Sequence, residues 1–109
     1  MTVNLFADKT SFSVLTMPSP DKKVSGAYVG DLLSWVMGKA EAGNVWITIM
    51  SNVNVCAVAS LTDCSCILLA EGVRLDDDVL SIAKDKGINI LSTELSAFEA
   101  SVKIAELVK

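Results

Sequence analysis

The fold is decided by a short apolar run near the middle of the chain, Val45-Trp46-Ile47-Thr48-Ile49-Met50. Polar residues and a glycine border it, with Gly43-Asn44 before it and Ser51-Asn52 after it, which is typical of a β-strand between two turns. Its nearly continuous hydrophobicity predicts burial on both faces, as in a parallel strand covered by helices. Two further runs share this character and are predicted as strands, Cys66–Ala70 and Ile88–Ser92.

Segments with helical spacing alternate with these strands. We expect helices over residues 53–61, 76–86 and 94–108, the last of them capped by Thr93 or Ser92. Its inward face is predicted to carry Leu95, Phe98, Val102, Ile104 and Leu107. Strands that alternate with helices favour an α/β fold, here a small parallel or mostly parallel sheet flanked by helices.

The amino-terminal third is less regular. We expect a short helix over residues 2–9, strands over residues 12–16 and 24–29, and a helix over residues 31–37. The buried side of that last helix is predicted to carry Leu32, Leu33, Val36 and Met37. With no linker, internal repeat or low-complexity stretch, residues 1–109 are expected to form a single domain.

Charge and hydropathy exclude two classes of expected partner, nucleic acids and membranes. The formal net charge is -4 and Arg74 is the only arginine, so no basic stripe is present to bind a phosphate backbone, and we expect no nucleic-acid partner. No apolar run reaches the roughly 18 to 20 residues that cross a bilayer, and no leader pattern opens the chain. The expected location is therefore cytoplasmic, without membrane attachment.

Side chains that carry familiar chemistry are scarce. The chain has no histidine, which removes the usual general base and every imidazole metal ligand. Cys56, Cys64 and Cys66 are expected to be packed thiols, because a closed metal site needs about four ligands and a redox pair is usually C-x-x-C. Neither a dinucleotide fingerprint nor a Walker phosphate loop is present. We therefore expect no cofactor, no metal and no catalytic residue.

A ligand would most readily bind where the parallel strands end, because loops and helix amino termini meet there. Three loops qualify, residues 51–54, 71–74 and 92–94. Their small polar side chains either cap helices or bind a ligand. The candidate ligand-binding residues are Ser51, Asn52, Asn54, Ser92, Thr93 and Glu94.

The segment Val24-Ser25-Gly26-Ala27-Tyr28-Val29-Gly30-Asp31-Leu32-Leu33-Ser34-Trp35-Val36-Met37-Gly38 resembles the signature of the DRTGG domain. Further matches follow in the same order: Gly43-Asn44-Val45-Trp46-Ile47-Thr48, Asn54, Ala57-Val58-Ala59-Ser60-Leu61, Gly87-Ile88, Leu91-Ser92-Thr93 and Ala97-Phe98-Glu99. The resemblance runs from about Thr2 to Leu107, so the chain looks like a stand-alone copy of this domain. It departs from the family where Ser25-Gly26-Ala27 replaces the usual Thr-Gly-Gly and Ser51-Asn52 replaces Thr-His.

The resemblance implies a fold similar to the amino-terminal domains of HPr kinase/phosphorylase and the muramyl-peptide ligases. In larger proteins the DRTGG module accompanies phosphotransacetylases and CBS-containing pyrophosphatases. By this analogy the chain is expected to be a non-catalytic regulatory or interaction domain, homodimeric, whose signal is a protein partner or a small anionic ligand such as an adenine nucleotide. The kinase half of HPr kinase is missing, so kinase activity is not implied.

Three hypotheses remain open at this point. For the homodimer, the expected interface is the apolar surface of Tyr28, Val29, Leu32, Trp35 and Val36, although for Trp35 core packing is favoured over an interface role. The alternative is a small enzyme for a phosphorylated or carboxylated metabolite, with Asp31 or Glu94 as base and Ser51 or Ser92 as donor or nucleophile. A redox or metal module built on the cysteines is the third.

Overall fold

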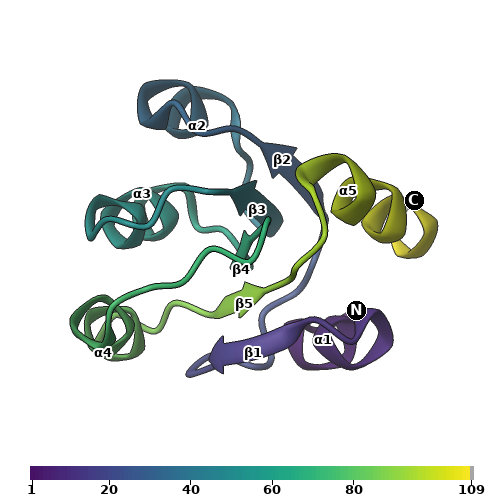
Figure 1. Ribbon diagram of the computed structural model, residues 1–109, viewed down its shortest axis with the longest axis horizontal. Coiled ribbons are helices and arrows are strands. Elements are labelled where there is room, and N and C mark those ends of the chain that lie inside the picture. The colour runs from purple at the N-terminus through teal and green to yellow at the C-terminus, as the bar shows by residue number, and fades with distance from the viewer. Residues whose placement is uncertain (109) are drawn as a thin grey trace.

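The computed structural model describes residues 1–108, which form five strands and five helices (Figure 1). The strands are β1 (Ser13–Thr16), β2 (Gly26–Val29), β3 (Asn44–Thr48), β4 (Cys66–Leu69) and β5 (Ile90–Ser92). The helices are α1 (Val3–Thr10), α2 (Leu33–Lys39), α3 (Asn54–Thr62), α4 (Asp77–Asp85) and α5 (Ala97–Leu107). Among these residues no helix combines the length and the apolar character that a membrane crossing requires.

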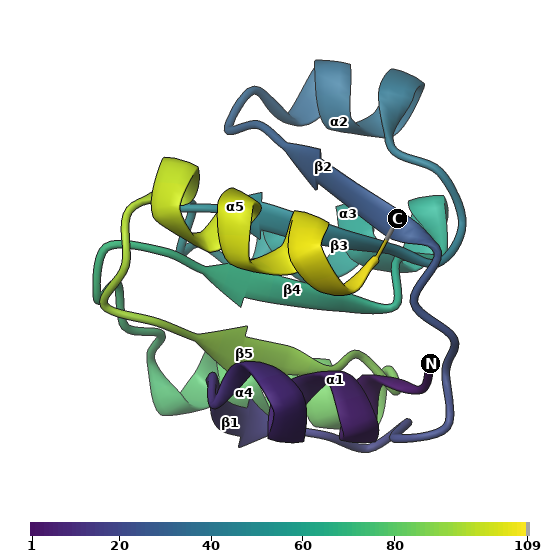
Figure 2. The same cartoon turned by 90° about the vertical axis from the view of Figure 1, so that its right-hand side faces the viewer.

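The five strands form one sheet in the order β1-β5-β4-β3-β2. Neighbouring strands from β2 to β5 run parallel, and β1 pairs antiparallel with β5 at the edge. Three layers result, with α2, α3 and α4 on one face of the sheet and α1 and α5 on the other (Figures 1 and 2). The prediction of a mostly parallel α/β fold is confirmed.

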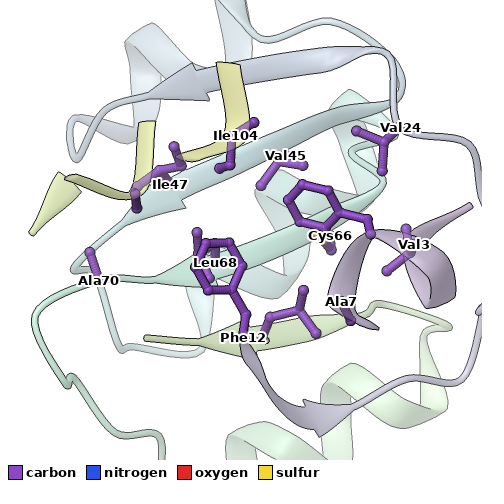
Figure 3. Packing of buried hydrophobic residues seen from close by; sticks show 13 residues of the cluster. Val3, Ala7, Phe12, Val24, Val45, Ile47, Cys66, Leu68, Ala70 and Ile104 are labelled. Carbon is purple, nitrogen blue, oxygen red and sulfur yellow. The ribbon is translucent and has the colours of Figure 1, made fainter. Parts of the chain in front are cut away.

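Both faces of the central strands are buried, as their continuous hydrophobicity predicts. Trp46 and Ile67 point toward the layer of α2, α3 and α4, where the Trp46 Nε1–H donates to the carbonyl oxygen of Gly30 at 2.9 Å. Ile47 and Leu68 point to the other face and pack with residues of α1 and α5 (Figure 3). Burying side chains on both faces removes the most apolar area from water, so it contributes the largest favourable term to the stability of this small domain.

The inward face predicted for the last helix is only partly correct, since Leu95 and Ile104 contact the core but Phe98 and Val102 do not. Phe98 and Val102 are 76% and 46% exposed, whereas Ala100 and Ile104 are buried. The helix begins at Ala97 and is capped by Ser96, which forms a reciprocal capping box with Glu99, so neither Thr93 nor Ser92 is its cap. The small Ala100 side chain lies against the sheet, and this rotates the larger residues outward.

The buried side predicted for residues 31–37 is only partly correct. Val36 is completely buried and Leu33 is half-buried, whereas Leu32 and Met37 are exposed. The observed helix α2 has seven residues and lies at the β2 edge of the sheet. A helix of two turns has few positions that can face a core, so most of its apolar residues stay on the surface.

Candidate cavity at the strand ends

The loops that follow β4 and β5 are joined by main-chain hydrogen bonds. The N–H of Glu71 donates to the Leu95 carbonyl oxygen at 2.8 Å, and the N–H of Gly72 donates to the Thr93 carbonyl oxygen at 2.9 Å. The N–H of Thr93 donates to the Leu69 carbonyl oxygen at 2.9 Å. Paired loops thus continue β4 and β5 beyond their carboxyl ends, and their hydrogen bonds fix the backbone there in one arrangement.

Gly72 is required by this arrangement for two reasons. Its φ is +69°, a backbone conformation in which a side chain is strained. A Cβ atom at this position would also overlap the carboxylate of Glu94. The Glu94 side chain therefore occupies the space that the missing side chain leaves, and the loop positions it.

A cavity of about 440 Å³ lies between these loops, the first turns of α4 and strand β1. This volume is within the range of about 300–1,000 Å³ that is usual for small-molecule sites. Its apolar wall consists of Leu15, Val73, Leu75 and Leu80. Its polar side chains are Ser13, Arg74, Asp77, Ser92, Thr93 and Glu94. An adjoining groove of about 520 Å³ shares Leu15, Asp77 and Leu80 with this cavity but has neither Arg74 nor Glu94 in its lining.

The charged groups of the cavity are not paired with each other. Arg74, Asp77 and Glu94 are all exposed to solvent within it. Within residues 1–108 the one ion pair lies elsewhere, between Lys22 and Asp63 at 2.7 Å. The guanidinium group and the two carboxylates are therefore available to a bound molecule.

The structure brings three of the six candidate ligand-binding residues together, since Ser92, Thr93 and Glu94 line this one cavity. Ser51, Asn52 and Asn54 lie apart from it, exposed after β3 and at the start of α3. Asn52 Oδ1 accepts from the Asn54 N–H at 2.9 Å, a local turn that precedes α3, whose N-cap residue is Val53. Their separation follows from the strand order, because β4 lies between β3 and β5.

Residues of β1 and α4 complete the cavity, and the sequence did not single them out. Ser13 and Leu15 line it only because β1 adds to the far edge of the sheet beside β5. Arg74 lies in one of the three loops expected at the strand ends, and Asp77 in the first turn of α4. The unique arginine was the signal that could have directed attention to this loop.

The residues proposed for an enzyme do not form a pair of base and nucleophile. Asp31 Oδ1 accepts from Thr48 Oγ1 at 2.7 Å and from the Ile49 N–H at 3.0 Å, so it joins the ends of β2 and β3 and does not contact Ser51. Glu94 and Ser92 line the same cavity, yet within residues 1–108 no hydrogen bond joins their side chains. A serine needs a base within hydrogen-bond reach to become a nucleophile.

The three cysteines are free thiols inside the core. Burial raises the pKa of Cys56 and of Cys64, and it raises the pKa of Cys66 to about 12. Thiols with raised pKa values remain protonated at neutral pH and react slowly. No group of three or more metal-ligating side chains is found within residues 1–108.

The candidate interface residues divide between surface and core. Leu32 and Trp35 are 61% and 58% exposed, whereas Val29, half exposed on the edge strand, pairs with Ile47 and therefore faces the α5 side of the sheet. The Lys39 ammonium lies 4.8 Å from the centre of the Trp35 ring. Val36 is fully buried and cannot contribute to an interface, and Tyr28 is half-buried against the core. The exposed pair next to α2, called here the α2 edge face, consists of Leu32 and Trp35.

A mostly parallel five-stranded sheet between two layers of helices, with a mixed-charge cavity at its strand ends, defines a small α/β domain. The chain belongs to the DRTGG domain family, whose model matches residues 22–107. The resemblance of residues 24–38 is thereby confirmed. Comparison with curated proteins gave no match.

A solved structure shares the fold, the CBS and DRTGG domains of the regulatory region of Clostridium perfringens pyrophosphatase complexed with its activator, diadenosine tetraphosphate. The TM-score is 0.70 and the sequence identity is 18%, and the similarity covers 93% of this chain and 44% of that one. The chain therefore spans less than half of that structure. In that pyrophosphatase the DRTGG domain belongs to a regulatory region.

Proposed function

We propose that this chain is a regulatory domain without catalytic activity of its own, which forms a homodimer and responds to a small ligand. The observation that carries the proposal is the cavity of about 440 Å³, where unpaired charged side chains lie on rigidly joined loops. The regulatory role of the DRTGG domain in the pyrophosphatase supports it. The enzyme hypothesis is weaker, because no base contacts Ser51 or Ser92 among the described residues.

The anionic group of a ligand is proposed to bind Arg74. This is the one cationic side chain in the cavity lining, and a guanidinium presents several donors to a carboxylate or phosphate. Adenine nucleotides are the first ligands to test, since the activator of the pyrophosphatase regulatory region is a diadenosine compound. A protein partner that covers the same loops is the other proposal for the signal.

The ligand proposal is tested by thermal unfolding with AMP, ADP and ATP at concentrations up to the millimolar range. A ligand that binds only the folded chain raises the unfolding temperature in proportion to the logarithm of its concentration. We expect Arg74→Gln to abolish that rise, and the control Lys9→Gln, on the far helix α1, to leave it unchanged. If no nucleotide and no other small molecule raises the unfolding temperature, the ligand part of the proposal is wrong.

The homodimer is proposed to form through the α2 edge face. Large exposed apolar side chains that lie together on a surface favour contact with another protein, and tryptophan is enriched in such contacts. A two-fold axis would place Leu32 and Trp35 of one chain against the same residues of the other. The neighbouring β2 is an edge strand, which leaves this side of the sheet open.

Analytical ultracentrifugation tests the homodimer directly. We expect the chain to sediment as a dimer at high micromolar concentration, and Leu32→Ser or Trp35→Ser to shift it to the monomer. Phe98→Ser is the matched control, because Phe98 is equally exposed but lies on α5, on the opposite face of the sheet. A monomeric wild-type chain, or an equal effect of Phe98→Ser, would refute the proposed face.

A further inference from the structure

We infer that the strand-end cavity binds a zwitterion, a small molecule with one ammonium group and one carboxylate, of the kind that amino acids and short peptides provide. This inference rests on the proposed function and specifies the chemical class of its ligand. It follows from the signs, positions and pairing of the charged groups in the cavity.

The cavity has two negative side chains and one positive side chain, namely Asp77, Glu94 and Arg74. Opposite charges that lie close together form ion pairs within 4 Å, and these three form none. They are therefore held apart while lining one space. A molecule with charges of both signs can contact both kinds of side chain at once, which neither a simple anion nor a simple cation can do.

The balance of charge disfavours a polyanion. A ligand with several phosphate groups would gain attraction from Arg74 but would meet repulsion from Asp77 and Glu94. The whole chain, with a net charge of -4, adds to that repulsion. A zwitterion places its carboxylate at Arg74 and its ammonium group at the two carboxylates, so no like charges meet.

The two carboxylates are well placed to bind the ammonium group. Glu94 lies against Gly72 on loops that three main-chain hydrogen bonds hold together, so its backbone position is fixed before a ligand binds. Asp77 lies in the first turn of α4, an element that also holds its backbone in place.

The rest of the lining suits the uncharged part of such a molecule. Leu15 and Leu80 form an apolar wall, where an aliphatic or aromatic side chain can pack. Ser92 and Thr93 add hydroxyl groups to the lining, and the Thr93 Oγ1 accepts from the Leu95 N–H at 3.2 Å, which leaves its own proton free to donate.

The experiment is an NMR titration of the full chain, labelled with nitrogen-15, against the twenty standard L-amino acids, AMP and inorganic phosphate. The amino acid that binds most tightly is then compared with its N-acetyl derivative, which lacks the ammonium group, and its carboxamide, which lacks the carboxylate. We expect the free amino acid to shift the amide signals of Gly72 and Glu94. Each derivative is expected to bind at least tenfold more weakly.

Two variants of the protein test the same inference from the side of the cavity. Glu94→Gln and Arg74→Gln are each expected to weaken amino-acid binding at least tenfold. Asp85→Asn is the control, because Asp85 is exposed at the other end of α4 and is not part of the cavity lining. The spectra of all variants report whether the fold is retained.

Binding of AMP or phosphate in the cavity, without binding of any amino acid, would refute the inference that the ligand is a zwitterion. The proposed regulatory function would not be affected by that result. Equal affinities for the amino acid and its two derivatives would also refute the zwitterion inference. If no probe binds, the zwitterion inference and the ligand part of the proposed function fail together, and sedimentation then decides the homodimer independently.

Discussion

The paired loops of the cavity give a sharp test, the substitution Gly72→Ala. Two costs add at this position. A left-handed backbone costs an alanine about 1–2 kcal/mol relative to its preferred conformations. The new methyl group also displaces the Glu94 carboxylate, the far end of a flexible side chain, at a cost of roughly 0.5 kcal/mol. The free energy of unfolding should therefore fall by about 1.5–2.5 kcal/mol.

A double-mutant cycle with Glu94→Ala separates the two costs. Glu94 is exposed, so Glu94→Ala alone should change the stability by less than about 0.5 kcal/mol. In the Glu94→Ala background, Gly72→Ala should lower the stability by the backbone cost alone, so the coupling energy between the two sites should be roughly 0.5 kcal/mol. Gly87→Ala is the matched control, because Gly87 also has a positive φ, +74°, but lies far from Glu94.

Urea unfolding followed by circular dichroism provides these free energies. For a domain of this size each kcal/mol also lowers the unfolding temperature by about 4–8 °C, which a thermal melt resolves. The predicted coupling is refuted if Gly72→Ala lowers the free energy of unfolding equally with and without Glu94, and by no more than Gly87→Ala does. In that case the loop does not position the Glu94 carboxylate. The rigid placement of Glu94 assumed for ligand binding would then be wrong.

Three further predictions concern the fold. Leu68→Ala should lower the free energy of unfolding by about 2–5 kcal/mol, as measured in urea, because Leu68 is fully buried in the central strand. Gly38→Ala should raise it by roughly 0.5–1 kcal/mol, since Gly38 is inside α2 and nothing lies within 4 Å of a Cβ atom there. The pKa of Cys66 rises from 9.0 to about 12 in the folded chain, so this thiol ionises first in the unfolded chain. The buried, protonated Cys66 thiol contributes fully to the free energy of unfolding below pH 9. Between pH 9 and about 12 that contribution should decline by about 1.4 kcal/mol per pH unit. Unfolding at pH 8 and pH 10.5 should thus show a smaller alkaline loss for Cys66→Ala than for wild type.

The central strands and the helices between them could be predicted because their patterns are determined by burial. A strand such as β3 that is covered on both faces must be apolar at nearly every position, and Trp46 indeed lies fully in the core. The face of α5 could not be predicted from hydrophobicity, because Ala100 and not Phe98 approaches the sheet. The signal for its start was present, however, since Ser96 and Glu99 have the spacing of a capping box.

The candidate site was only half predictable for a topological reason. The sequence shows which polar loops follow strands, but it does not show which strands are neighbours. Ser92 and Thr93 meet Arg74 because β4 and β5 are adjacent, and Ser51 does not because β3 lies one strand further away. The contribution of Leu15 depends on an antiparallel edge strand, and its direction cannot be read from a short alternating segment.

Helix α5 connects the strand-end cavity with the strand next to the α2 edge face. The loop that carries Glu94 leads into α5, and α5 packs on β2, the edge strand that precedes α2 in the chain. A ligand that moves this loop can therefore change the dimer through α5 and its buried contact at Ala100. Thermodynamic linkage then sets a quantitative condition: a ligand that strengthens dimerisation tenfold must bind the dimer more tightly than the monomers by the same total factor, about 1.4 kcal/mol. Sedimentation at several ligand concentrations and ligand titrations at several protein concentrations must give one coupling energy. A coupling energy near zero would show that α5 does not connect the two surfaces.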